Sequence, residues 1–298
     1  YQETEDQEAA ITDVLMDLST GVSMDRLVCG DVGFGKTEIA LRAAMVVALD
    51  GYQVAILTPT TLLASQHFQT FKQRFQDIPV NVAKLSRFET PKDKSSLLKK
   101  LASGNLDIVL GTHALLSQSV KFKKLGLLIV DEEQHFGVAH KERLKQYRED
   151  VHVLTLTATP IPRTLQLALT GVRDLSIIRT PPVDRLVVRT FVMGFDSMII
   201  REAILREKNR GGQCFFVVPR ISDISLMSEF LNSDVPEISF GVAHGRLSGR
   251  KLDSIIESFL HRRVDVLLST SIIESGLDFP NANTIIVFKS DIFGLSQL

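Results

Sequence analysis

The sequence predicts an α/β protein of two domains, each a mainly parallel sheet flanked by helices. From residue 27 onward, short β-rich apolar runs alternate with longer amphipathic stretches, the pattern of buried parallel strands joined by helices. A length of 298 residues is enough for two domains that each bury a core. The paired prolines of "RTPPVDRL" (179–186) favour an extended connector. We therefore predict a first domain over residues 1–182 and a second over 183–298.

In the first domain, glycines and prolines mark the ends of the helices. They predict helices over 37–49, 60–76 and 91–103. The predicted strands are the runs "RLVCG", "YQVAILT", "VNVAKLS", "LDIVLGT", "LGLLIVDE" and "VHVLTLTAT".

The same alternation resumes after the connector. Helices are predicted over 196–210, 223–232 and 248–262, and strands at "QCFFVVP", "ISFGVAH", "VDVLLST" and "NTIIVF". This half has no glycine-lysine-threonine element of its own.

The composition is typical of a soluble globular protein, with 44% hydrophobic and 23% charged residues. No apolar run approaches the roughly 18 residues of a membrane span, and "YQETEDQEAA" lacks the regions of a signal peptide. We therefore expect a cytoplasmic protein with no membrane partner. Cys29 and Cys214 lie in apolar runs, which favours packing over a disulfide or a metal site. Because the net charge is −1, nucleic-acid binding would need a local basic surface.

A phosphate-binding loop is predicted in "GDVGFGKTEIA" (30–40). The stretch fits G-x-x-x-x-G-K-[ST] with Gly30, Gly35, Lys36 and Thr37, between a predicted strand and a predicted helix. Glycines such as Gly33 let backbone N–H groups converge on phosphate oxygens, lysine supplies positive charge, and the threonine hydroxyl can bind Mg²⁺. The alternative is a glycine-rich turn with no ligand.

Three consecutive carboxylates, Asp131, Glu132 and Glu133, follow the buried run "LGLLIV". Open α/β sheets place their ligand crevice at such strand ends. Asp131 suits a hold on Mg²⁺ through water, and Glu132 would orient and deprotonate an attacking water. The alternative, a solvated acidic turn, is weakened by the phosphate loop upstream.

Several short segments occur in a characteristic order: "GDVGFGKTE" (30–38), "PTTLLASQH" (59–67), "GTH" (111–113), "DEEQ" (131–134), "TAT" (157–159) and "STSIIESGLDFPNANTII" (269–286). They resemble motifs I, Ia, the following DNA-contact motif, II, III and V of helicase superfamily 2, and nearly the whole chain is covered. The resemblance implies two RecA-like domains that use ATP and Mg²⁺.

Within the superfamily, "MDRLVCGDVGFGKTEIALRAA", "LSRF", "FGVAHKERLK", "LTLTATPIPRTL" and "DLSIIRTPP" resemble the motor of the bacterial transcription-repair coupling factor family. "AHGR" and "TATPIPRT" are also similar to the RecG branch-migration helicases, which usually carry Ser where this chain has Phe34. The first resemblance implies an ATP-driven translocase on double-stranded DNA. Its partners would be RNA polymerase that has stalled at a lesion and, in addition, excision-repair proteins. Both would bind through regions outside this chain.

The resemblance also implies residue roles. Gln7 would read adenine, with Thr4 nearby, and Gly276 and Asp278 would add nucleotide contacts from the second domain. The implied ATP-binding residues are Gln7, Gly30, Asp31, Val32, Gly33, Phe34, Gly35, Lys36, Thr37, Glu38, Gly276 and Asp278. Catalysis is assigned to Lys36, Asp131, Glu132 and Gln134, the hold on Mg²⁺ to Thr37 and Asp131, and coupling of hydrolysis to domain movement to Thr157 and Thr159.

The residues expected to face the DNA backbone are Thr60, Thr61, Arg87, Thr112, His113, His244, Gly245 and Thr270. Hydroxyls and a few cations bind phosphates at any base sequence, which suits a motor. The alternative for each threonine is an ordinary helix cap or strand residue. His67 and His135 are interpreted as packed or exposed rather than catalytic.

Two features depart from the family pattern. "DEEH" followed by Arg is common in the family, whereas this chain has Gln134 and His135, although Gln still offers the hydrogen bond towards motif III. The chain also stops at "DIFGLSQL", before the arginine-rich motif VI. We expect a second domain truncated at its C-terminus. We also expect the chain to bind Mg-ATP but to hydrolyse it weakly, because a missing arginine finger costs about 10³ to 10⁵ in rate.

Alternative functions remain open at this point. One is a RecG-like remodeller of forks or junctions, and another is an ATP-binding module that switches a protein interaction without motor activity. A GTPase is disfavoured because no N-K-x-D guanine signature occurs in the sequence.

Overall fold

The computed structural model describes residues 3–86, 89–158, 173–181, 188–270 and 276–294. The chain divides into two compact units, Tyr1–Val187 and Val188–Leu298. The boundary predicted between residues 182 and 183 falls within 182–187, outside the described residues. It therefore stays a prediction.

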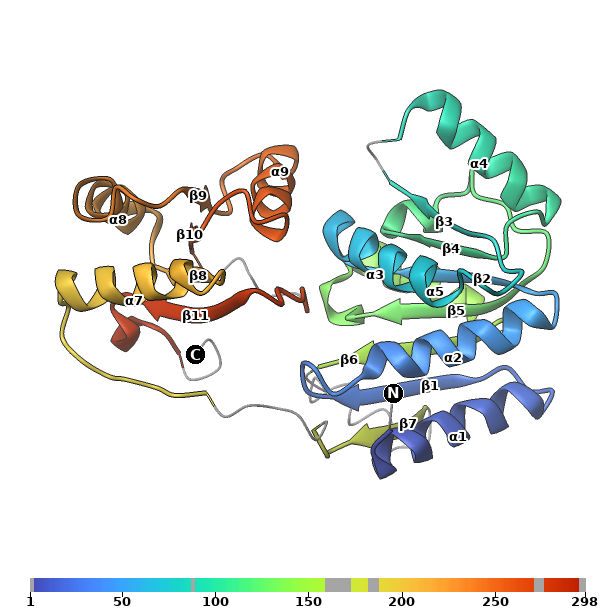
Figure 1. The fold of residues 1–298 in the computed structure, drawn as a ribbon. Coiled ribbons are helices and arrows are strands. Elements are labelled where there is room, and N and C mark those ends of the chain that lie inside the picture. The colour runs from blue at the N-terminus through green and yellow to red at the C-terminus, as the bar shows by residue number, and fades with distance from the viewer. Residues whose placement is uncertain (1–2, 87–88, 159–172, 182–187, 271–275, 295–298) are drawn as a thin grey trace. The chain divides into compact units, whose positions relative to one another are not determined.

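Unit 1 contains a seven-stranded sheet in the order β3-β4-β2-β5-β6-β1-β7 (Figure 1). Each described strand pair in it is parallel. The strands are β1 (Asp25–Gly30), β2 (Gln53–Leu57), β3 (Val82–Leu85), β4 (Ile108–Gly111), β5 (Leu125–Asp131), β6 (His152–Thr157) and β7 (Asp174–Ile178).

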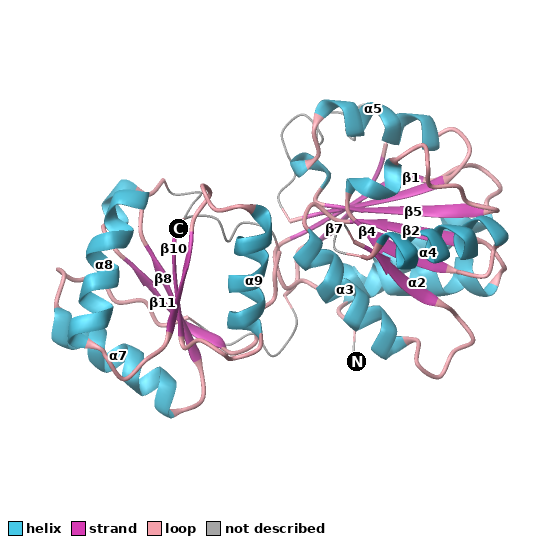
Figure 2. Cartoon of the chain, turned by 90° about the horizontal axis from the view of Figure 1, so that it is seen from above, coloured by secondary structure: helices cyan, strands magenta, loops and turns pink. Residues whose placement is uncertain are grey.

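Helices cover both faces of this sheet. Apolar side chains of α1 (Glu5–Ser19), α2 (Lys36–Leu49) and α3 (Thr61–Arg74) form one core with one face. Those of α4 (Pro91–Ser103), α5 (Val138–Tyr147) and the 3₁₀ turn η1 (His113–Leu116) form a second core with the other face. Figure 2 shows α5 on one side of the strands and α2 and α3 on the other. A short 3₁₀ turn, η2, spans Glu133–His135.

The three helices predicted in this half are confirmed as α2, α3 and α4, but among the described residues two further α-helices and one strand were not predicted. One of them, α1, carries a clear start signal: the Thr4 side chain accepts from the N–H of Gln7, and the Gln7 side chain accepts from the N–H of Thr4. This reciprocal capping box is readable in "TEDQ". The others are α5 and the edge strand β7.

Unit 2 is a smaller version of the same architecture. Its four strands are all paired in parallel in the order β11-β8-β10-β9. Helices α7 and α8 contribute to one core and α9 to another, and Figure 2 shows them on opposite sides of the strands. The bounds are α7 (Ser197–Asn209), β8 (Gln213–Val217), α8 (Ile221–Asp234), β9 (Phe240–Ala243), α9 (Gly249–Leu260), β10 (Val266–Ser269), β11 (Ala282–Val287) and the 3₁₀ turn η3 (Ser290–Ile292). None of the helices in the described parts of the two units combines the length and the hydropathy of a membrane span.

His152, the first residue of β6, gives unit 1 a pH-dependent contribution to stability. Its Nδ1 accepts a hydrogen bond from the N–H of Met24 at 3.1 Å, which requires a ring unprotonated at Nδ1. Burial lowers the pKa of His152 below its ordinary value of 6.5. Below pH 6.5 the unfolded chain therefore binds a proton that the folded unit does not, so this contribution is present above that pH and is lost as pH falls through the folded pKa.

We expect the melting temperature to fall on acidification below about pH 6.5, as followed by thermal denaturation. The variant His152→Asn keeps an oxygen that can accept from Met24 but does not titrate there, so it should lose this part of the pH dependence. An identical pH dependence in the wild type and the variant would contradict the assignment.

Candidate active site

The predicted site residues of unit 1 gather at one edge of its sheet, where the strands end. Strands β5, β6 and β1 are neighbours, and they end at Asp131, Thr157 and Gly30. Because the strands are parallel, their carboxyl ends lie at the same edge, the usual position of a ligand crevice.

The loop between β1 and α2 has the backbone of a phosphate cradle. Gly33 and Gly35 have φ values of +80° and +76°, which side-chain-bearing residues rarely adopt. A Cβ added at Gly33 would meet no heavy atom within 4 Å, so this side of the loop is open. Gly35 is the N-cap of α2, and the N–H of Glu38 donates to its carbonyl oxygen at 2.9 Å. The N–H groups of Lys36 and Thr37, which come before it, are the ones that an anion would bind at this helix end.

Lys36 reaches back into this loop. Its Nζ donates to the carbonyl oxygens of Gly30 at 2.6 Å and Asp31 at 3.1 Å. Burial lowers the pKa of Lys36, and the carboxylates of Glu132 and Asp131 oppose that shift. A partly buried ammonium beside open N–H groups fits a phosphate, so the residues present fit the phosphates of a nucleotide.

Glu132 is held in place by residues at the end of β6. Its Oε1 accepts from the N–H of Ala158 at 3.0 Å. Its Oε2 lies within hydrogen-bonding reach of the Gln134 amide and, at 3.4 Å, of the Thr157 hydroxyl. The backbone of Glu132 has φ +50°, a conformation that is uncommon for residues other than glycine. It changes the direction of the chain directly after β5. Glu132, Gln134 and Thr157 therefore form one network, whereas Thr159 lies outside the described residues.

The three consecutive carboxylates point to different partners. Asp131 is hydrogen-bonded to His67 of α3, with 2.9 Å between Oδ2 and Nε2. Glu133 forms ion pairs with Arg148 and Arg173, at 3.0 and 3.1 Å. Glu133 is thus a structural residue, while Asp131 and Glu132 lie at the strand end beside the loop. The contact between His67 and Asp131 was missed by the sequence interpretation.

Gln7 and Glu38 are already engaged with protein groups. The Gln7 amide donates to the carbonyl of Phe34 in the phosphate loop at 2.8 Å, and its oxygen accepts from Thr4. Gln7 is only 1% exposed, so it supports the phosphate loop from the buried side. Glu38 is 7% exposed and accepts from Arg42 and Arg74.

Asp31 and Val32 are exposed on the phosphate loop, and Thr37 lies in the first turn of α2. Their assignment to ATP stays a prediction.

The residues predicted to face DNA in unit 1 follow β2 and β4, at the same sheet edge. Thr60 caps α3, where its hydroxyl accepts from the N–H of Leu63 at 3.2 Å, and Thr61 begins the helix. Thr112 precedes η1, and the ring of His113 lies 4.7 Å from that of His140. Arg87 lies outside the described residues.

In unit 2, the predicted residues also follow neighbouring strands. His244 and Gly245 come directly after β9, and Thr270 directly after β10. Among the described residues, His244 Nδ1 and the hydroxyl of Ser269 are buried atoms without a hydrogen-bond partner. Buried polar atoms of this kind are uncommon and suit a site that receives a ligand. Gly276 and Asp278 are exposed on the segment before β11.

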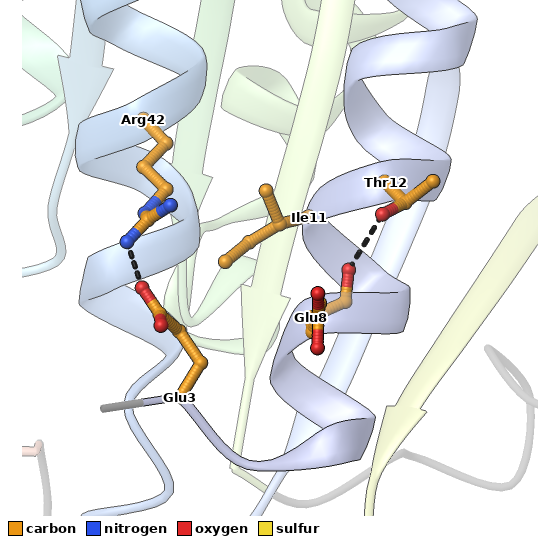
Figure 3. A pocket seen from close by; sticks show the side chains of 5 residues that line it. All are labelled: Glu3, Glu8, Ile11, Thr12 and Arg42. Atoms are coloured by element: carbon orange, nitrogen blue, oxygen red, sulfur yellow. Dashed lines mark hydrogen bonds and ion pairs between the residues drawn. The ribbon is translucent and has the colours of Figure 1, made fainter.

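A shallow pocket of about 430 Å³ between α1 and α2 is a different feature. Figure 3 shows its lining, with the ion pair between Glu3 and Arg42 on one side and the hydrogen bond from the Thr12 hydroxyl to the carbonyl of Glu8 on the other. None of the lining residues belongs to the predicted ATP or DNA sets, so the strand-end loop remains the candidate site.

Comparison with protein families gives two matches. Residues 4–168 match the family model described as DEAD/DEAH box helicase. Residues 196–298 match the model described as helicase conserved C-terminal domain.

The chain is also similar to individual proteins and to a solved structure. The transcription-repair-coupling factors of Bacillus subtilis and Escherichia coli are each 53% identical over 298 residues, which is 100% of this chain and 25% and 26% of theirs. The chain thus spans about a quarter of these curated relatives. A solved structure of RecG bound to a three-way DNA junction has a TM-score of 0.84 and 36% identity, and the match covers 100% of this chain and 40% of RecG.

Proposed function

We propose that this chain, which belongs to the DEAD/DEAH box helicase family, is an ATP-driven motor that moves along double-stranded DNA. The family follows from the model match, which covers more than half of the 298 residues. The predicted fold class is confirmed: the chain contains two RecA-like helicase domains with parallel sheets flanked by helices. Helicase domains of this superfamily use a nucleotide and Mg²⁺ in general.

The more specific proposal is a motor of transcription-coupled repair. It is supported by the 53% identity to transcription-repair-coupling factors over the whole chain. In this proposal ATP hydrolysis moves the protein on duplex DNA, displaces stalled RNA polymerase and brings excision-repair proteins to the lesion. The cytoplasm is the proposed location, because the substrate is chromosomal DNA.

The proposed chemistry assigns one task to each group at the strand ends. The N–H groups of the loop and Lys36 bind the β- and γ-phosphates, and Thr37 and Asp131 hold Mg²⁺. Bound Mg²⁺ would neutralise charge on the phosphates. Glu132 orients a water molecule and takes its proton, and its own position is kept by Ala158, Thr157 and Gln134.

The observation that carries this proposal is the hydrogen-bond network of Glu132. A glycine-rich turn or a passive nucleotide switch needs no carboxylate held beside the phosphate loop. Here Glu132 is 6% exposed, and its carboxylate contacts Thr157, the residue predicted to couple hydrolysis to domain movement. Such positioning of a base supports hydrolysis rather than binding alone.

The DNA-facing residues support a motor that does not read sequence. The described ones in unit 1 are three threonines and a histidine at one sheet edge, and hydroxyls and imidazoles are groups that bind phosphates. The test is the ATPase rate with and without duplex DNA, measured for this chain and for one extended through motif VI, together with displacement of a triplex-forming strand by the longer chain as a readout of translocation. A rate that duplex DNA does not stimulate, or an undisturbed triplex, would contradict the proposal.

RecG-like remodelling of DNA forks is a second candidate, favoured by the TM-score of 0.84 and 36% identity to RecG. The two candidates share the chemistry and differ in the substrate. Displacement of a stalled RNA polymerase in the absence of fork regression supports the first, and regression of a model fork without polymerase displacement supports the second.

Replacing Gln134 with alanine is expected to lower the maximal ATPase rate by about tenfold or more, because a hydrogen bond to a charged group is worth about 1.5–3 kcal/mol. Gln134 contacts Glu132 and Thr157 and has no predicted contact with the nucleotide, so ATP affinity should change little. Steady-state kinetics would show a lower kcat with KM nearly unchanged. Glu142→Ala on α5, an exposed carboxylate in an ion pair with Lys145, is the control. A Gln134 variant that behaves like this control would remove Gln134 from the proposed network.

A further inference from the structure

His67 of α3 contacts the carboxylate at the end of β5. The Nε2 of His67 lies 2.9 Å from Oδ2 of Asp131, and the two side chains are 13% and 11% exposed. An ionised carboxylate only accepts hydrogen bonds, so the N–H at Nε2 is the donor. The bond fixes one oxygen of Asp131 and leaves the other for Mg²⁺ or its water.

The same helix carries residues of the predicted DNA-facing set. Thr60 is the N-cap of α3, Thr61 is its first residue, and His67 lies six residues further, about 9 Å along the axis. Lys84 of β3 donates to the hydroxyl of Ser65 at 2.8 Å, which ties the helix to the edge of the sheet. One rigid element thus connects the DNA-facing end to Asp131.

We propose that His67 is a positioning residue: it holds the Asp131 carboxylate in the orientation that Mg-ATP needs, and it links the DNA-facing end of α3 to that carboxylate. The inference rests on the proposed ATP-driven function. Groups that hydrogen-bond a metal-binding carboxylate typically change metal affinity 10- to 100-fold when they are replaced.

Two variants separate the donor from the ring. His67→Gln places an amide N–H close to the position of Nε2, whereas His67→Phe keeps an aromatic ring without a donor. The matched control is Gln69→Ala, an exposed residue on the same helix. Thermal denaturation of each variant checks that unit 1 folds.

The first measurement is the affinity for a fluorescent ATP analogue in EDTA and in Mg²⁺. In His67→Phe we expect the strengthening of binding by Mg²⁺ to fall by about tenfold or more, with affinity in EDTA unchanged. His67→Gln should restore most of it, and Gln69→Ala should match the wild type. If the phenylalanine variant keeps the full Mg²⁺ effect, or if glutamine is as poor as phenylalanine, the inference is wrong.

The second measurement repeats the Mg²⁺ titration with duplex DNA. Coupling between two sites is reciprocal, so in the wild type DNA should change the affinity for the Mg-bound analogue, and in His67→Phe this change should disappear. A DNA effect that persists in the variant would overturn the link through α3. Absence of any Mg²⁺-dependent binding in the wild type would overturn the proposed function together with this inference, whereas wild-type binding with an unaffected variant would overturn the inference alone.

Discussion

In a chain extended through motif VI, replacing Glu132 with glutamine is expected to lower the rate of DNA-stimulated ATP hydrolysis by about 10²- to 10⁴-fold, the usual contribution of a general acid or base. Glutamine keeps the size of the side chain and an oxygen that can accept from Ala158, but it cannot take a proton from water. Affinity for ATP should stay nearly the same. A kinetic comparison with the wild type would therefore show a loss in kcat with little change in KM.

Glu133 provides the matched control, because it is the next residue and has the same chemistry. Its carboxylate forms ion pairs with Arg148 and Arg173, and Arg173 also pairs with Asp25 at 2.8 Å. Glu133→Gln should keep the hydrolysis rate within a few-fold and lower the melting temperature, since it weakens an ion-pair network around an arginine that is only 6% exposed. Equal losses of rate in both variants would contradict the separate roles.

Replacing Lys36 with alanine is expected to weaken ATP binding by about 10- to 100-fold. The magnitude corresponds to loss of a hydrogen bond with a charged partner, about 1.5–3 kcal/mol. The change should depend on the phosphates: affinity for AMP should be nearly unaffected, because Lys36 is assigned to the β- and γ-phosphates. Competition titrations with ATP, ADP and AMP against a fluorescent analogue measure this directly.

The control for charge is Lys99→Ala, which removes an exposed lysine on α4. It should bind all three nucleotides like the wild type. If Lys36→Ala binds ATP normally, or if its affinities for AMP and ATP fall equally, the assignment of Lys36 to the phosphates is wrong.

The phosphate loop and the carboxylates could be predicted because their signals are local. Gly33, Gly35 and Lys36 act through backbone conformation and spacing within a few residues, and the apolar run before Asp131 marks a buried strand by itself. Parallel pairing then brings these strand ends to one edge, so the juxtaposition of the phosphate loop and the carboxylates follows from the fold class.

The contacts of individual side chains could not be predicted in this way. His67 lies 64 positions from Asp131, and a histidine on an amphipathic helix satisfies the helical pattern whether it packs, faces solvent or binds a carboxylate. One of the two partners of Glu133 is Arg173, 40 positions away. Strand β7 was missed because "DLSII" begins with Asp174 and contains the polar Ser176, so it lacks a continuous apolar run. These features depend on three-dimensional distance, which periodicity does not encode.

The parallel pairing of β1 also has a consequence for synthesis of the chain on the ribosome. Strand β1 is the first strand made, but its neighbours are β6 and β7, and Leu27 is paired with Thr155 and Leu175. At bacterial translation speeds of about 5–20 residues per second, β1 waits on the order of ten seconds for its first partner. During that time its apolar residues must be shielded by α1 and α2 or by a chaperone. The nucleotide loop, which extends from β1, is therefore complete only late in the emergence of unit 1.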